Sequence, residues 1–208
     1  MHPFLRVSNV IDRVTEAIGK SVMWLILAAV LVSAINAIIR KLFNISSNSW
    51  LELQWYLFGA AFLLASANTL QQNEHIRIDI VYGALSRRTQ HWIDLLGHMF
   101  FLLPFVLILS WMLIPYTWQA YQSHQISSNS GGLVIWPARA LLAAGFVLLV
   151  FQAISEIIKK IAVMRGAIED PHQFVSAHEA AELEGAAIAA ALAEAEALAA
   201  EKAKREAK

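Results

Sequence analysis

Four long apolar stretches, separated by shorter polar ones, occupy most of the first three quarters of the chain. They cover about residues 21–39, 50–70, 92–118 and 135–158. Each is close to the ~20 residues that an α-helix needs to cross a ~30 Å hydrocarbon core. The pattern predicts an all-α integral membrane protein, with a four-transmembrane-helix bundle inside a membrane domain over residues 21–165.

The composition indicates a protein that is surrounded partly by lipid. The 208 residues are 58% hydrophobic and only 15% charged, where soluble domains carry about a quarter charged residues. All seven tryptophans lie at or near predicted span ends, as expected of amphipathic rings at headgroup depth. The formal net charge is zero, which argues against nucleic acid as a partner. The chain has no cysteine, which excludes thiol chemistry and disulfides.

Lysine and arginine are distributed unequally between the two sides. They gather before the first span, between the second and third, and after the fourth, and none occurs from Thr89 to Ala138. The positive-inside rule then predicts a multi-pass protein of the bacterial inner membrane with both termini in the cytoplasm. The residues on the predicted inner side are Arg6, Arg13, Lys20, Arg77, Arg87, Arg88, Lys159, Lys160 and Arg165; those on the outer side are Arg40, Lys41 and Arg139.

Two segments have the spacing of amphipathic helices. In residues 4–18, apolar side chains recur at three- and four-residue intervals opposite Asp12, Arg13 and Glu16. Residues 76–85 repeat the pattern. We expect interfacial amphipathic helices on the cytoplasmic side, the first forming a segment over residues 1–20. They either anchor the spans or brace a partner subunit.

Residues 166–208 form a third region, rich in alanine and glutamate and basic at its end. Alanine and glutamate are strong helix formers. The composition predicts a cytoplasmic tail that is helical or partly disordered, with contact between copies as the alternative.

One carboxylate, Glu52, lies at the outer end of the second span. We consider two interpretations: Glu52 forms an ion pair with Arg40 or Lys41 at the end of the first span, or it contacts a partner. An ionisable group in a membrane helix is costly and therefore functional by default.

Other ionisable groups lie near the inner ends of the third and fourth spans. Asp94 and His98 are one helical turn apart and are expected to share a hydrogen bond. Glu156 precedes Lys159 and Lys160 at the spacing of helix-end charge pairs.

The middles of all four spans contain no Asp, Glu, Lys or Arg. Secondary transporters bind substrate near the midplane, in broken helices of internal repeats, and neither feature is present in the sequence. There is no phosphate-binding GxxxxGK[ST] motif of an ATPase either. Small residues instead predict close helix packing in the second span: Gly59, Ala60, Ala61, Ala65, Ser66 and Ala67.

The chain resembles the small permease subunits of TRAP transporters, the DctQ-like family, in its longer type. Four stretches carry the resemblance, which covers roughly residues 5–165. They are 50–56 (WLELQWY), 67–79 (ANTLQQNEHIRID, with the family's His-x-Arg-x-Asp element), 131–139 (GGLVIWPAR) and 145–152 (GFVLLVFQ).

The resemblance implies a non-enzymatic subunit of a secondary active transporter, with no cofactor, metal or catalytic residues. Such subunits pair with a large multi-span subunit that moves and carries the substrate and sodium sites of the symport. A periplasmic binding protein delivers the substrate, typically an organic acid. The small subunit is then a scaffold in contact with membrane phospholipid, and it uses a partner-contact or structural cluster: Glu52, Trp55, Tyr56, His75, Arg77 and Asp79.

A competing hypothesis is the membrane anchor of a redox enzyme that binds haem or quinone. Four-helix bundles hold haem between histidines on facing helices. Here His91 and His98 share one helix, His75 lies near the inner interface and His124 falls in the opposite loop, so no facing pair is available at depth. A channel is disfavoured because no polar stripe crosses the bilayer.

Overall fold

The computed structural model describes residues 2–44, 47–73, 82, 85–170, 185 and 188. Contacts divide the chain into two units. The first comprises residues 1–76 and 87–170, and the second comprises residues 77–86 and 171–208. All elements below belong to the first unit. The cluster His75, Arg77 and Asp79 lies outside the described residues, as do most of the predicted helix at 76–85 and most of the tail.

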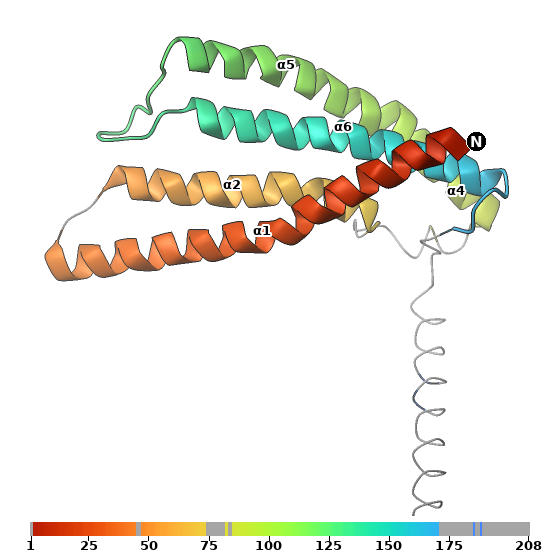
Figure 1. Ribbon diagram of the computed structural model, residues 1–208, viewed down its shortest axis with the longest axis horizontal. Helices are drawn as coiled ribbons and strands as arrows, with labels where there is room; N and C mark the ends of the chain where they lie inside the picture. Colours follow the sequence, from red (N-terminus) through yellow and green to blue (C-terminus); the bar gives the residue numbers. More distant parts are fainter. Residues whose placement is uncertain are drawn as a thin grey trace, which may run out of the picture. The chain divides into compact units, whose positions relative to one another are not determined.

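The described part of the first unit is built of helices, which confirms that the fold is all-α. Its elements are α1 (His2–Phe43), α2 (Asn48–Gln71), α4 (Arg87–Leu96), the π-helix η1 (Gly97–Leu102), α5 (Leu103–Gln122) and α6 (Trp136–Met164) (Figure 1). Three stretches are long and apolar enough to cross a membrane: Pro3–Phe43, Arg87–Gln122 and Trp136–Met164. Helix α2, the predicted second span, has 24 residues and includes polar side chains at both ends.

Helix α1 joins the predicted interfacial segment and the predicted first span without a break. It has 42 residues, which at 1.5 Å per residue is about 63 Å, roughly twice the hydrocarbon thickness. Beyond its first turn it contains no proline, and the one glycine, Gly19, lowers helix propensity without ending the helix. The helix is therefore about twice as long as one crossing of the hydrocarbon core requires.

The third predicted span is a continuous helical rod with a wide turn inside it. At η1 the hydrogen bonds join residues five apart, and the N–H of Leu103 donates to the carbonyl of His98. Pro104 follows directly. Proline has no N–H, and its ring would collide with the carbonyl of Phe100 in a regular α-helix, so the backbone widens there.

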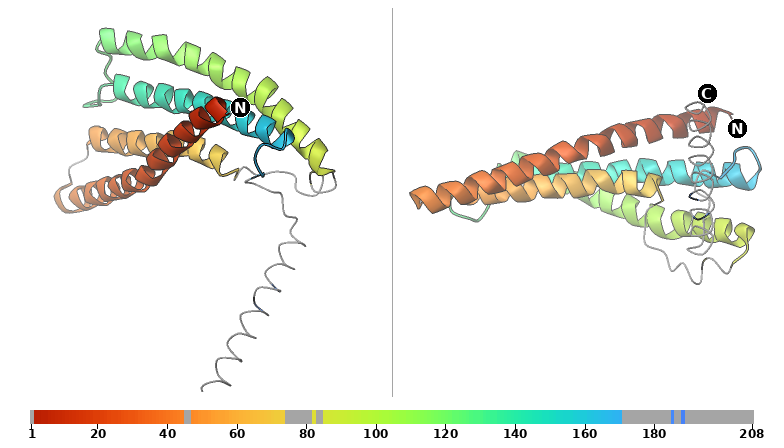
Figure 2. Two further views of the ribbon diagram at one scale, coloured as in Figure 1. Left: turned by 45° about the vertical axis from the view of Figure 1, so that its right-hand side comes forward. Right: turned by 90° about the horizontal axis from the view of Figure 1, so that it is seen from below.

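The helices lie in a row, in the order α5, α6, α2, α1 (Figure 1). Each packs against its neighbour in the row, and the first half of α1 crosses over to contact α6 (Figure 2). At that end α6 lies between α1 on one side and α4 on the other. The arrangement is a twisted layer, where the sequence had predicted a bundle.

Small residues allow close approaches between helices. A Cβ at Gly145 of α6 would lie 2.8 Å from the Cβ of Leu63 on α2, and one at Gly19 of α1 would lie 2.6 Å from the Cγ of Asn68. Of the predicted small-residue patch, Ala60, Ala61 and Ala67 are buried, whereas a Cβ at Gly59 would touch nothing within 4 Å; Ala65 and Ser66 are half-buried. Helix α2 is thus an inner member of the row, packed against α1 on one side and α6 on the other.

Candidate functional site

Polar side chains gather at the two ends of the helical layer. We call the end with the start of α1 and the end of α6 the terminal end, and the end with residues 123–135 the loop end. Each holds a network that joins segments far apart in the sequence.

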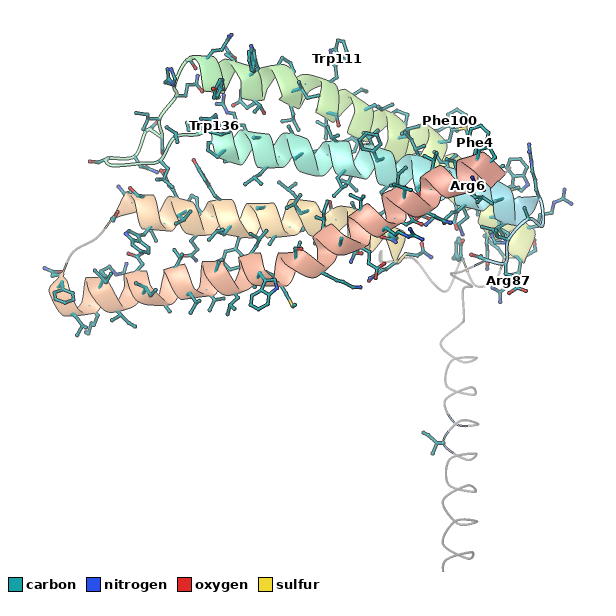
Figure 3. The ribbon with its side chains drawn as sticks, in the orientation of Figure 1. Phe4, Arg6, Arg87, Phe100, Trp111 and Trp136 are labelled. Carbon is teal, nitrogen blue, oxygen red and sulfur yellow. The ribbon has the colours of Figure 1, made fainter. Side chains whose placement is uncertain are left out.

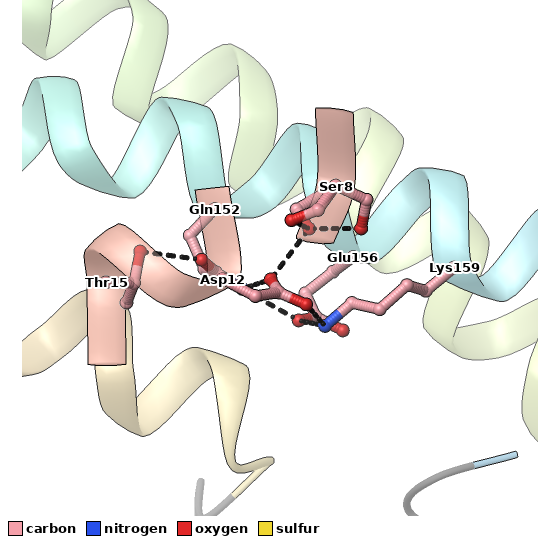
Figure 4. Close-up of polar contacts among 7 residues, drawn as sticks. Ser8, Asp12, Thr15, Gln152, Glu156 and Lys159 are labelled. Carbon is pink, nitrogen blue, oxygen red and sulfur yellow. Dashed lines mark hydrogen bonds and ion pairs between the residues drawn. The ribbon is translucent and has the colours of Figure 1, made fainter. Parts of the chain in front are cut away.

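At the terminal end, a polar stripe of α1 packs against a polar stripe of α6 (Figure 4). Ser8 and Thr15 are fully buried. The hydroxyls of Ser8 and Ser155 lie 2.6 Å apart, and Thr15 Oγ1 donates to Gln152 Oε1 at 2.9 Å. We call this contact the α1–α6 seam. Its members are Ser8, Asp12, Thr15, Gln152, Ser155, Glu156 and Lys159.

The carboxylate of Asp12 is the centre of the seam. It accepts hydrogen bonds from Ser155 Oγ at 2.8 Å and from Gln152 Nε2 at 3.0 Å, and it pairs with Lys159 Nζ at 3.1 Å. Lys159 also pairs with Glu156 at 2.5 Å, and Gln152 Nε2 donates a hydrogen bond to the Glu156 carboxylate at 3.0 Å. Two carboxylates therefore share one ammonium group and one amide donor, which compensates the cost of their burial.

The expected pairing of Glu156 with both following lysines is correct only for Lys159. Lys160 reaches the other side of α6, where its Nζ lies 3.0 Å from Asp94 of α4 and 3.9 Å from Asp170. His91 lies 3.7 Å from the same Asp170 carboxylate. Successive residues of a helix point about 100° apart, so the two lysines bind α6 to two different neighbours.

The predicted bond between Asp94 and His98 forms through a different atom. Nδ1 of His98 lies 2.7 Å from the backbone carbonyl of Asp94, not from its side chain. The Asp94 carboxylate instead pairs with Lys160, because a carboxylate buried between α4 and α6 needs a positively charged partner.

At the loop end, Glu52 of α2 enters the turn between α5 and α6. It is only 6% exposed. Its carboxylate accepts hydrogen bonds from the Ser127 hydroxyl, from Asn129 Nδ2 at 2.7 Å and from the Leu133 N–H at 2.6 Å. The expected ion pair with Arg40 or Lys41 is not among the contacts of the described residues, since the three loop donors already occupy the carboxylate.

Three more side chains of α2 bind carbonyl groups of the same loop. Asn48 Nδ2 donates to Ser130 at 2.9 Å, Ser49 Oγ donates to Gly131, and Tyr56 donates to Val134 at 3.2 Å. We call these residues with Glu52 the α2 clamp. They share one helix face, since they fall at positions i, i+1, i+4 and i+8.

The loop itself is shaped to meet the clamp. Ser127 N–H donates to the Leu133 carbonyl at 2.9 Å, and Ile135 N–H donates to Gln125 at 3.0 Å, so the two arms of the loop pair. Gly131 has φ +70°, and a Cβ at Gly132 would lie 2.9 Å from the Glu52 carboxylate. The Gly-Gly pair, recognised as part of a motif in the sequence, therefore permits both the turn and the close approach of the carboxylate.

Large apolar side chains cover the outward faces of the layer. Trp111 and Phe100 project from α5 and Phe4 projects from α1 (Figure 3), and Trp111 is 82% exposed. Trp55, expected in the same cluster as Glu52, also points outward and is exposed. In water such surfaces would be unfavourable, so they fit contact with lipid or with another membrane protein.

The described histidines are distributed over both ends. His91 and His98 lie on one helical rod near the terminal end, and His124 follows α5 at the loop end. Among the described residues there is no group of three or more His, Asp or Glu side chains arranged to hold a metal ion. The polar networks described above join helices of this part of the chain.

Comparison with known families identifies the chain. The family model described as "Tripartite ATP-independent periplasmic transporters, DctQ component" matches residues 29–163, more than half of the chain. No curated protein and no solved structure matches it. With its membrane-spanning helices, the chain therefore belongs to the DctQ family, the small membrane component of TRAP transporters, and is a multi-pass inner-membrane protein.

Proposed function

We propose that this subunit is the fixed scaffold that holds the large transport subunit of a TRAP transporter during sodium-coupled uptake of an organic acid. The observation that carries the proposal is the use of the buried charges. Asp12, Glu52 and Asp94 all bind groups of their own chain. A transport site instead offers polar groups to substrate or ions at mid-membrane depth.

The proposed scaffold has four spans, namely the three long apolar stretches described above and α2. Helix α2 lies between α1 and α6 and packs along both. Its 24 residues extend about 36 Å, enough to cross the hydrocarbon core. A helix enclosed between two spans would keep its polar ends at the two interfaces, with Glu52 near one and Asn68 near the other.

The terminal end is proposed to face the cytoplasm. Described basic residues gather there, and few lie at the loop end, which fits the positive-inside rule. The terminal-end residues are Arg6, Arg13, Lys20, Arg87, Arg88, Lys159, Lys160 and Arg165; those at the loop end are Arg40, Lys41 and Arg139. The loop of residues 123–135 would then face the periplasm, where the binding protein delivers substrate.

The first part of α1 is proposed to lie at the cytoplasmic interface. Gly19 is level with Asn68, three residues before α2 ends, and Gly145 is level with Leu63. Most of the α1–α6 seam therefore lies beyond the end of α2. With the polar stripe of α1 facing α6, its apolar residues Phe4, Val7, Val10 and Val14 face outward and are exposed. Such a face suits the headgroup boundary or a partner subunit.

The partner-contact surface is proposed to include Trp55 and, outside the described residues, the cluster His75, Arg77 and Asp79. Charge reversal at Arg77 is expected to weaken assembly with the large subunit more than it changes substrate affinity. Altered substrate preference with assembly intact would contradict this role.

Reconstitution tests the scaffold directly. The full chain is placed in proteoliposomes alone, together with the large subunit, and with the large subunit and the binding protein, and sodium-dependent uptake is measured in each. We expect uptake only when the large subunit is present, and co-purification of the two membrane subunits. Sodium-dependent uptake by this chain alone would show that it carries substrate and would refute the proposal.

A further inference from the structure

A cavity of about 460 Å³ lies between α5 and α6 near the loop end. The exposed side chains of Trp118, Tyr121 and Trp136 form its rim. Ala140 and Ala143, one and two turns after Trp136, leave the space that larger residues would fill. Its lining is Ile114, Thr117, Trp118, Tyr121, Trp136, Ala140 and Ala143.

The aromatic residues of the rim support one another. The rings of Trp118 and Tyr121 stack at 5.7 Å between centroids, and Tyr121 meets Trp136 edge-to-face at 5.5 Å. Contacts of this kind hold side chains in fixed positions. The rim thus forms a stable apolar wall that joins the two helices.

One polar atom in this wall has no partner. The hydroxyl oxygen of Thr117 is buried, and no described residue forms a hydrogen bond with it. Buried threonines in helices usually donate to the carbonyl one turn earlier, as Thr69 does to Ala65 at 3.2 Å. A buried hydroxyl without a bond is costly, so Thr117 is suited to a ligand that brings an acceptor.

The position of the cavity indicates the kind of acceptor. Thr117 lies five residues before the end of α5 at Gln122, and tryptophan and tyrosine gather at this level, as they do at the boundary between headgroups and acyl chains. The groups at this boundary that accept hydrogen bonds and attach to hydrocarbon are the ester carbonyls of phospholipids.

We propose that this cavity binds a diacyl phospholipid of the loop-end leaflet. One acyl chain lies between Trp118 and Trp136 over the two alanines, and an ester carbonyl accepts a hydrogen bond from Thr117. A helix of another subunit fits less well, because it is about 10 Å wide and its backbone carbonyls are already bonded within it.

The test compares two lipids that differ only at the linkage. The full chain is purified and exchanged into a detergent with either a diester or a diether phospholipid of the same headgroup and chains, and native mass spectrometry counts the retained lipid. One neutral hydrogen bond corresponds to about three- to tenfold in affinity. We therefore expect the diester to be retained about three- to tenfold better.

Three variants locate the effect. Thr117→Val keeps the shape of the side chain and is expected to remove the preference for the diester. Thr69→Val, in which the lost hydroxyl bonds only its own helix, is the matched control and should keep it. Ala143→Leu is expected to reduce retention of both lipids, and a thermal unfolding curve for each variant confirms folding.

Equal retention of the two lipids by the unaltered chain would overturn the proposal, as would a diester preference that survives Thr117→Val. If Ala143→Leu keeps its lipid but no longer co-purifies with the large subunit, the cavity receives a partner helix and the lipid assignment is wrong. The lipid measurement uses this chain alone, so its failure would leave the proposed scaffold role untouched.

Discussion

Asp12 shows how a single side chain can join two distant parts of a membrane protein. It receives two hydrogen bonds and one ion pair from α6. Asp12→Ala would remove one hydrogen-bond acceptor from Ser155 and one from Gln152, and it would leave Lys159 paired with Glu156 alone. We expect a loss of about 1–3 kcal/mol, the cost of unpaired buried polar groups, measured as a lower unfolding midpoint in detergent.

Glu16 provides the control for this change. It lies one turn from Asp12, and among the described residues its ion-pair partner is Lys20, at an exposed position of the same helix. Glu16→Ala should change stability by less than about 0.5 kcal/mol. Equal effects of the two substitutions would mean that the α1–α6 seam does not stabilise the fold.

Glu52 differs from Asp12 in that its described hydrogen-bond partners are all donors without a formal charge. In Glu52→Gln one acceptor oxygen becomes an N–H₂ group and meets a donor. The loop should open more often, and hydrogen exchange at the Leu133 N–H should accelerate about tenfold, which corresponds to about 1.4 kcal/mol. The amide of Gly132, which donates within the loop to Asn129, should accelerate with it. Unchanged exchange at both would show that the clamp does not hold the loop.

The sequence did not predict which groups these two carboxylates contact. The spacing in residues 4–18 predicted a helix and an apolar face, and both are present. It could not show that the polar side of the helix would face α6, because that depends on which surface lipid covers. Asp12 was therefore placed only opposite the apolar face, and Ser8 and Thr15 were not singled out. The only indication in the sequence was a matching set of polar positions on α6 (Gln152, Ser155, Glu156 and Lys159). Matching these positions to the polar side of α1 requires knowing that the two helices pack together.

At the scale of the element, α6 and α2 pack closely at Gly145. A Cβ there would lie 2.8 Å from the Leu63 Cβ and 3.2 Å from its carbonyl oxygen. Gly145→Ala must therefore separate two helices, and we expect a destabilisation of about 1–3 kcal/mol. Gly59→Ala places its methyl in open space and should instead stabilise by up to about 1 kcal/mol through helix propensity. Thermal unfolding of both variants under the same conditions compares them, and equal midpoints would contradict the close packing.

Elements were easier to predict than their contacts. The apolar runs located α1, the rod of residues 87–122 and α6, because length and hydropathy determine whether a helix can cross lipid. The small-residue pattern indicated α2 as a packed helix but not which residues touch, and Gly59 remained open. The π-turn at η1 was not predicted, since Pro104 disturbs the helix in a way that depends on how the backbone relaxes around it.

At the scale of the whole molecule, the row of helices exposes both faces of the layer, and the basic residues distinguish its two ends. The chain has no cysteine, so single cysteines report topology without background. Phe43→Cys and Ser128→Cys mark the loop end, while Gln72→Cys and Ala167→Cys mark the terminal end, and all four positions are exposed. We expect a membrane-impermeant maleimide to label the first pair in intact spheroplasts and the second pair only after permeabilisation.

Comparing the two positions on either side of one helix decides a separate point for each helix. Phe43 and Gln72 flank α2, so labelling of both from the same side would show that α2 does not cross and that the scaffold has three spans. Ser128 and Ala167 flank α6, which is apolar enough to span on its own. If Ala167→Cys were labelled outside and Ser128→Cys only after permeabilisation, the termini would face the periplasm. The clamped loop could then not lie on the side where a periplasmic protein delivers substrate.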